Sequence, residues 1–285
     1  MNARFLEQPG PALEPRVLCE PCSARKITRR FPARKSVHQA ISEALAGENA
    51  EAAVIEIAAA DLAQLVYVIP APSPSPEHVA WYSERRKPEG MARLEKASMS
   101  FGWERGAPFI HCHGIWSHAD GFRAGGHLIT EETEFGRETE ATVWVVDSAR
   151  LERLADTETN FSLLTPVPGG GRESSADAFR ALLLRIKPNS DIHASIESTA
   201  ADHGVRNATI HGVCSLIDCD FVDGTHMASY ASEAFIADGR LENGNARLTI
   251  GVTALDAKVF EGEIVRGGNI TCIACEILIV ERAEG

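Results

Sequence analysis

Hydrophobic positions along the chain follow first a helical and then a strand period. From Ser36 the sequence VHQAISEALAG places its apolar residues on one helical face, with Ser36 as N-cap and Gly47 at the C-terminal end. The apolar stretch 52–70 then predicts one or two strands, and the proline-rich segment 70–77 predicts a loop. Further strands are expected over 91–101 and 139–147, with a hairpin over 108–130 between them.

The same order of elements returns in the second half of the chain. A strand is expected over 178–187, followed by a helix over 191–204 that Asn189 or Ser190 caps. Strand patterns follow over 205–222 and 226–238, then a hairpin pattern over 246–265 and a last strand over 269–281. This repeated order indicates an internal duplication, although the two halves share very little sequence identity.

Two segments fall outside the repeated pattern. Residues 1–29 are rich in proline and charge and are expected to form a flexible arm, while 148–172 are expected to be a linker with a short helical patch, ARLERLA. The predicted organisation is therefore an arm (1–29), a first domain (30–147), the linker and a second domain (173–285). The basic cluster of 25–35 is interpreted as solvated surface. Cys19 and Cys22 form a CxxC without a second pair nearby, which favours a chance pair over a metal or redox site.

Composition narrows the class of protein. The 285 residues, 44% of them hydrophobic, suffice for two domains that each bury a core. A net charge of −12 argues against binding to duplex DNA, which usually needs a basic surface. Seven cysteines without a signal-peptide pattern fit a reducing compartment, and no run of eighteen apolar residues is present. We expect a cytoplasmic protein that does not enter a membrane.

The hairpin over 108–130 carries the most informative chemistry. His111 and His113 are two residues apart, so on a strand their side chains share one face. A three-residue loop, 119–121 with glycine in third place, would set His118 opposite Phe122 and His113 opposite His127. In that register three imidazoles converge, since directly opposed Cβ atoms lie about 5 Å apart.

Three neutral imidazoles suit a divalent transition metal such as zinc, iron, nickel or copper. Three protein ligands and one open position are the usual arrangement of catalytic zinc, so zinc is the expected metal. Gly125 and Gly126, next to His127, would leave room for a ligand or for a neighbouring backbone. The alternative is structural: histidines on a sheet face also satisfy hydrogen bonds or line a subunit interface.

The second half provides an internal comparison. Aligning Glu261-Gly262-Glu263 with Gly125-Gly126-His127 places Arg247 at the position of His111 and Thr249 at that of His113. No imidazole is left, and Arg247 and Glu263 could form an ion pair across the hairpin. The second half is therefore expected to be structural and to bind no metal.

The segment HCHGIWSHADGFRAGGHL resembles the hallmark of the plant and prokaryote conserved (PPC) domain, an H-x-H, a turn and then G-G-H-L. The resemblance covers roughly 30–147 and, by element order, 173–283. It implies two tandem domains of α/β (α+β) class, each a mostly antiparallel sheet with helix cover, and assembly as a homotrimer. It also implies an upstream glutamate at the site, for which Glu95 and Glu233 are the candidates. Plant members carry AT-hooks and bind DNA, and bacterial members are often labelled candidate DNA-binding proteins. This chain has no hook.

Two functional hypotheses follow. In the first, His111, His113 and His127 bind the metal, and the protein acts on a small anionic molecule by metal-assisted hydrolysis or lyase chemistry. Glu95 would then be a general base, and Arg123 or Arg137 would neutralise the substrate, with solvated surface arginines as the alternative. In the second hypothesis, the protein binds DNA or a regulatory partner, and the histidines are structural at a subunit interface.

Overall fold

The fold of each half is one antiparallel sheet with one helix. The computed structural model describes residues 4–170 and 177–282. The elements of the first half are β1 (Val17–Phe31), α1 (Val37–Ala46), β2 (Ala52–Ile57), β3 (Ala60–Gln64), β4 (Tyr67–Val68), β5 (Pro70–Ala71), β6 (Trp81–Tyr82), β7 (Ala92–Glu104), β8 (Ala107–Ser117), β9 (Arg123–Leu128), β10 (Glu134–Phe135) and β11 (Thr139–Asp147). Those of the second half are β14 (Phe179–Ile186), α2 (Ile192–Asp202), β15 (Ala208–Ile217), β16 (Cys219–Asp220), β17 (His226–Met227), β18 (Ser232–Glu242), β19 (Asn245–Ala254), β20 (Val259–Glu263) and β21 (Ile270–Glu281). Between them lie β12 (Ala149–Ala155) and β13 (Ser162–Pro168).

The two halves pair their strands in the same order. In the first half the sequence of neighbours is β1-β11-β2-β7-β8-β9, and every pairing is antiparallel. In the second half it is β14-β21-β15-β18-β19-β20, again antiparallel throughout. This correspondence supports the duplication that the sequence predicts, and the mostly antiparallel sheets agree with what the resemblance to PPC domains implies.

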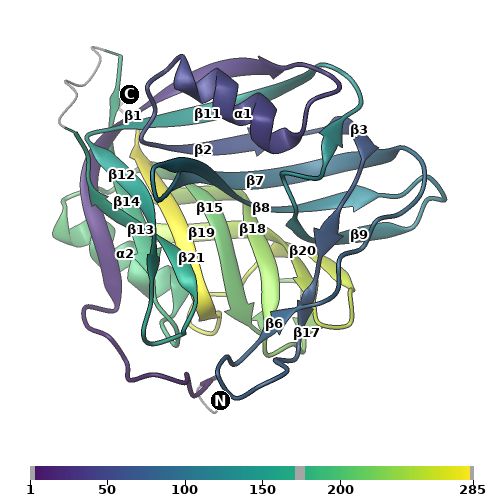
Figure 1. Cartoon of the computed structure of the whole chain (residues 1–285). Helices are drawn as coiled ribbons and strands as arrows, with labels where there is room; N and C mark the ends of the chain where they lie inside the picture. Colours follow the sequence, from purple (N-terminus) through teal and green to yellow (C-terminus); the bar gives the residue numbers. More distant parts are fainter. Residues whose placement is uncertain (1–3, 171–176, 283–285) are drawn as a thin grey trace.

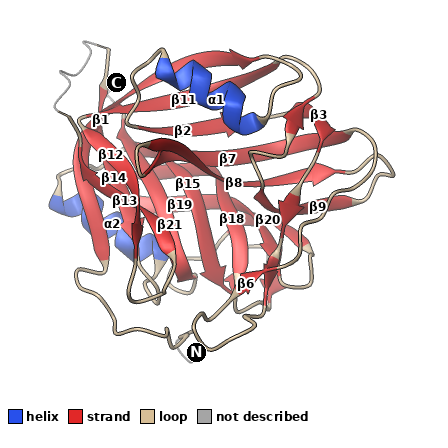
Figure 2. Cartoon of the chain, viewed as in Figure 1, coloured by secondary structure: helices blue, strands red, loops and turns tan. Residues whose placement is uncertain are grey.

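The two sheets pack face to face, with the helices outside. Alternate residues of a strand point to opposite faces, so Ile55 packs with α1 in one core cluster and Val54 joins a different one. This second cluster contains Val54 and Leu151 together with Leu183 and Leu278 of the second half, and it lies between the sheets. Figures 1 and 2 show α1 at the top and α2 at the lower left, with the strands between them.

Both helices begin at a capping side chain. Ser36 accepts a hydrogen bond from the Gln39 amide, as predicted. The second cap is Asp191, and the prediction of Asn189 or Ser190 is wrong. Asn189 has a left-handed φ of 59°, and its side chain binds the backbone of Leu6. No described helix is long and apolar enough to cross a membrane.

The expectation of a flexible arm over 1–29 is wrong for its second part. Residues 17–31 form β1, which pairs with β14 through its first half and with β11 through its second half. Its charged side chains find partners: Arg25 and Arg29 both contact Glu48. Cys19 and Cys22 are three apart on this strand and pack against different core clusters, so they form no common site. Burial raises the pKa of the two thiols to about 11 and about 12.

The short helical patch expected in 148–172 is also wrong. Residues 149–155 form β12, which pairs antiparallel with β13 to make a hairpin. Ala149 and Leu151 are buried while Arg150 and Glu152 are partly exposed, so the strand period of two fits this segment. The last two residues of the expected linker, 171 and 172, lie outside the described residues.

Candidate metal site

The histidine hairpin has the register that the turn predicts. His113 of β8 lies opposite His127 of β9. His118 donates its amide to the carbonyl of Phe122, and Gly121 has φ +85°, as a three-residue loop with glycine in third place requires. The ring centroids of His111 and His127 are 5.0 Å apart, and those of His113 and His127 are 5.6 Å apart. The three imidazoles therefore form one cluster.

The second half of the chain contributes a fourth group. Glu233 of β18 places Oε2 2.5 Å from Nε2 of His113. One ligand atom from each of His111, His113, His127 and Glu233 lies within 4.8 Å of all the others, a spacing that allows them to bind one metal ion. The site thus lies between the two sheets, with the histidines on one and the carboxylate on the other.

Hydrogen bonds at Nδ1 orient the rings of His111 and His113 and thereby direct their Nε2 atoms. Nδ1 of His111 lies 2.9 Å from Oε1 of Glu276 in β21, and Nδ1 of His113 lies 2.8 Å from the carbonyl oxygen of Ala234. Both partners are acceptors, so each Nδ1 carries a proton and donates it. In the neutral ring, Nε2 is then a lone-pair acceptor. This is the arrangement that metal-binding histidines show in proteins.

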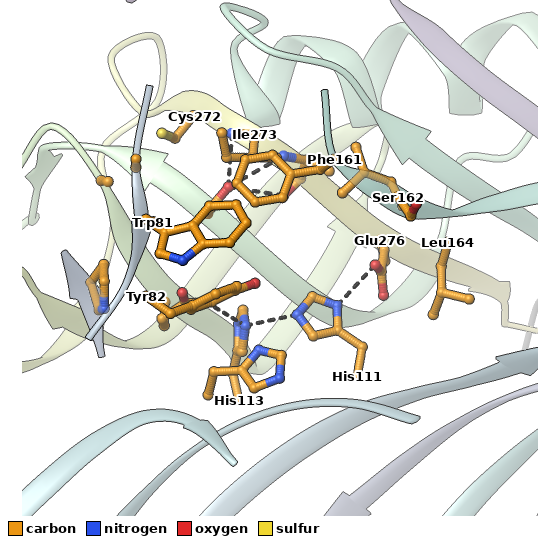
Figure 3. Close-up of a pocket in the computed structure, with 18 of the residues that line it drawn as sticks. Trp81, Tyr82, His111, His113, Phe161, Ser162, Leu164, Cys272, Ile273 and Glu276 are labelled. Atoms are coloured by element: carbon orange, nitrogen blue, oxygen red, sulfur yellow. Dashed lines mark hydrogen bonds and ion pairs between the residues drawn. The ribbon is translucent and has the colours of Figure 1, made fainter. Parts of the chain in front are cut away.

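These nitrogens face each other and need a shared cation. Nε2 of His111 and Nε2 of His113 are 2.9 Å apart (Figure 3). The Glu233 carboxylate lies 2.5 Å from Nε2 of His113. Two lone pairs and a carboxylate repel one another unless a proton or a metal ion lies among them. Nδ1 of His127 is buried and has no partner among the described residues. Two nitrogens on one tetrahedral zinc lie about 3.3 Å apart, so the rings need to separate only slightly. The residues fit a divalent metal.

The pKa values in the cluster diverge. Burial lowers the pKa of His127 well below its usual value, and the neighbouring rings of His111 and His113 lower it further. Burial also acts to lower the pKa of His111, but the Glu276 carboxylate outweighs it and raises that pKa. In return, the pKa of Glu276 is lowered, because its interaction with His111 outweighs the opposite effect of burial.

The cluster opens into a cavity of about 550 Å³ between the two sheets. Apart from the metal-binding groups, its walls come from the segment 70–85, from β8 and the residues just after β9, from the β12–β13 hairpin and the turn within it, and from the second half. The lining residues include Trp81, Tyr82, Phe109, Ile129, Arg153, Phe161, Leu163, Leu164, Ala231, Cys272, Ile273 and Glu276. In Figure 3 the histidines lie at one side of the cavity, and Trp81, Phe161, Cys272 and Ile273 lie across from them. Such a volume suits a small molecule.

The expected general base and anion-binding arginines lie elsewhere. Glu95 is in a β-bulge of β7, where it accepts hydrogen bonds from Ser117 and Arg123. Arg123 also contacts Glu261, so it joins the two halves rather than lining the cavity. Arg137 pairs with Asp61 at the surface. Their side chains are thus held in ion pairs away from the histidines.

Gly125 and Gly126 allow other segments of the protein to pack closely against β9. A Cβ on Gly125 would lie 2.4 Å from Oγ1 of Thr253, and one on Gly126 would lie 2.3 Å from the carbonyl oxygen of Val68. The sequence suggested that these glycines leave room either for a ligand or for a neighbouring backbone. At Gly126 the room is used by the backbone of Val68. Neither residue lines the cavity.

The equivalent hairpin of the second half has the predicted register and the predicted ion pair. Thr249 lies opposite Glu263, as His113 lies opposite His127. Nη2 of Arg247 is 2.7 Å from Oε2 of Glu263, which is the expected ion pair. The second half thus keeps the hairpin without its imidazoles and supplies carboxylates to the site of the first half.

Sequence reasoning missed several residues of the site. Glu276 had a visible signal, since it is the single charge within the apolar run of β21. Arg153 and Phe161 fell in a segment taken for a linker, and Tyr82 followed a loop of prolines. Only the packing of distant segments brings these side chains together.

Comparisons with known proteins found similarity among solved structures. No protein-family model and no curated protein matches the chain. Among solved structures, the chain is similar to a metal-containing protein from Archaeoglobus fulgidus, at 20% identity over 52% of this chain and 97% of that one, with a TM-score of 0.43. A PPC protein from Pyrococcus horikoshii matches at 18% identity over 51% and 94%, with a TM-score of 0.38. A candidate DNA-binding protein from Ralstonia eutropha JMP134 matches at 18% identity over 50% and 94%, with a TM-score of 0.39. Each of these matches spans about half of this chain, at an identity of 20% or less.

Proposed function

We propose that this protein binds one divalent transition metal, with zinc preferred, through His111, His113, His127 and Glu233. We further propose that it uses this metal on a small anionic molecule, by hydrolysis or lyase chemistry. The observation that carries the proposal is the pair of Nε2 atoms 2.9 Å apart, each oriented by an acceptor behind its ring. With both rings neutral, neither Nε2 can donate to the other, and a divalent metal ion between them would use both lone pairs.

Each group of the chain has a role in such a site. A bound divalent metal would act as a Lewis acid and lower the pKa of a coordinated water. His111 and His113 would hold it, while Glu276 and the Ala234 carbonyl keep the two rings in the required tautomer. His127 would add a neutral ligand, since its pKa is lowered. The surrounding apolar walls would exclude bulk water and strengthen electrostatic interactions with a substrate.

The structure favours this proposal over DNA binding. A DNA-binding surface needs unpaired basic side chains for the phosphates. The three arginines of β1 contact carboxylates instead: Arg25 lies 2.7 Å from Glu48, and Arg30 lies 3.4 Å from Glu140. The net charge of −12 points the same way.

Metal content tests the proposal directly. The purified, untagged protein is reconstituted with zinc, dialysed and analysed by elemental mass spectrometry beside the double variant His111→Ala/His113→Ala. About one metal per chain is expected in the parent protein and almost none in the variant. The matched control is Arg247→Ala/Thr249→Ala, which changes the equivalent positions of the second half and should leave the metal in place. Absence of metal from the reconstituted parent protein would refute the proposal.

A further inference from the structure

The cavity beside the metal site has two ends of different character. At one end are the histidines and Glu233, which would hold the cation. The far wall is apolar and includes Phe161, Leu163 and Ile273. A molecule that fills the cavity would therefore need one polar end that faces the metal and one apolar end. Figure 3 shows His111 and His113 on one side and Phe161 and Ile273 across from them.

The apolar end is built from flat side chains. Trp81 and Phe161 stack with their ring centroids 5.5 Å apart and an interplanar angle of 23°. His78 packs on both rings, at 4.5 Å and 4.6 Å between centroids. A hydrogen bond of 2.9 Å from Nδ2 of Asn160 to the carbonyl of Glu77 joins the two segments that carry these rings. On the histidine side, the Tyr82 ring lies 5.3 Å from that of His127. Aromatic walls favour a flat ligand, because rings gain from stacking and edge contacts beyond the area they bury.

One arginine of the cavity wall keeps a donor for an anionic group of the ligand. Both arginines that line the cavity pair with a carboxylate outside its lining, Arg85 with Glu132 and Arg153 with Glu104. Arg153 lies over the Phe109 ring, 4.6 Å from its centroid, and points from β12 toward the cavity. Its Nε and Nη1 contact Ser162 and Glu104. No described contact uses Nη2, which can therefore donate to an anion.

We propose that the cavity binds a small aromatic monocarboxylate, with the carboxylate between the metal and Arg153 and the ring against the Trp81–Phe161 wall. This inference rests on the proposed function, because the metal supplies half of the carboxylate site. It goes further by naming the class of ligand.

Four small probes separate the contributions of the ligand's charge, its ring and the flatness of that ring. Benzoate is titrated by calorimetry into the zinc-loaded protein, beside cyclohexanecarboxylate, acetate and benzyl alcohol. Cyclohexanecarboxylate keeps the charge and the size but loses flatness, acetate loses the ring, and benzyl alcohol loses the charge. Benzoate is expected to bind at least threefold more tightly than cyclohexanecarboxylate. It should also bind at least tenfold more tightly than acetate and benzyl alcohol.

Variants locate the two ends of the ligand. Arg153→Met should weaken benzoate binding at least tenfold with little effect on benzyl alcohol, and Phe161→Leu should remove the preference for benzoate over cyclohexanecarboxylate. Arg30→Met is the control, since Arg30 is an exposed arginine that pairs with Glu138 and Glu140. Benzoate binding no tighter than that of acetate in the unmodified protein would overturn the inference, whether or not the variants fold.

Zinc content is measured on the same samples, so the two proposals fail separately. Protein that holds zinc but shows no preference for benzoate refutes only the ligand class. Protein that holds no zinc refutes the proposed function as well.

Discussion

The substitution Glu276→Gln tests the metal site without touching a metal ligand. Oε1 of Glu276 accepts a hydrogen bond from Nδ1 of His111 at 2.9 Å, and the side chain is only 5% exposed. Glutamine has nearly the same shape and can still accept this bond through its amide oxygen, but it carries no charge. His111 would then lose the carboxylate that makes its ring a stronger ligand.

The expected loss of zinc affinity can be taken from other metal sites in which a carboxylate accepts a hydrogen bond from a metal-binding histidine. Loss of such a partner costs about 10–100-fold in metal affinity. This corresponds to about 1.4–2.7 kcal/mol of binding free energy. We expect the dissociation constant for zinc to rise by that factor, because the geometry of the ring is kept and only the charge behind it is lost.

The assay is competition for zinc between the protein and a chromophoric chelator at pH 7.5, with the unmodified protein and Glu276→Gln side by side. Glu281→Gln is the control, since Glu281 ends the same strand and contacts Arg180 away from the cavity. Thermal unfolding of the metal-free proteins verifies that each is folded. Zinc binding by Glu276→Gln as tight as that of the parent protein would refute the role given to Glu276.

Three further predictions concern pH and stability. Zinc should be released progressively as the pH falls from 7.5 to 5, because protons compete for the imidazoles and the raised pKa of His111 favours its protonation; a zinc-sensitive dye follows the release, and full retention at pH 5 would contradict this. Gly125→Ala should lower the free energy of unfolding by about 1–3 kcal/mol, because its Cβ would lie 2.4 Å from Oγ1 of Thr253; urea unfolding measures the change, and an unchanged midpoint would mean that the sheets part easily there. Arg185→Met should lower the free energy of unfolding by about 3–5 kcal/mol in the same assay, because it leaves the buried Asp156 carboxylate without its charged partner. A loss below about 1 kcal/mol would show that Asp156 finds water or another donor.

Local pattern predicted the histidine hairpin well. The three-residue loop with its terminal glycine determined which residues face each other, and alternation along the strand then determined the shared face of His111 and His113. Both rules act over a few residues of continuous chain. The ion pair between Arg247 and Glu263 followed from the same register.

The carboxylates of the site could not be derived in this way. The resemblance to PPC domains left Glu95 and Glu233 as candidates, and Glu95 lay closer in sequence to the histidines. A β-bulge turns Glu95 toward Ser117, whereas the packing of the second sheet on the first brings Glu233 within 2.5 Å of His113. Sheet-on-sheet packing leaves no periodic signal in a single sequence. For the same reason, β12 and its residue Arg153 were assigned to a linker.

Strand β1 couples the two repeats during folding as well as in the folded state. Its residues 17–24 pair with residues 179–186, which the ribosome makes some 160 positions later. The first sheet can form as soon as its own strands are made, but the first six residues of β1 pair only with β14 and must wait for it. Contacts of such long sequence separation slow folding. Cleavage near residue 170 would therefore not release two intact domains, because the amino-terminal fragment would carry half a strand without a neighbour. A fragment that begins at residue 177 would lack the edge that this strand protects, and we expect it to self-associate.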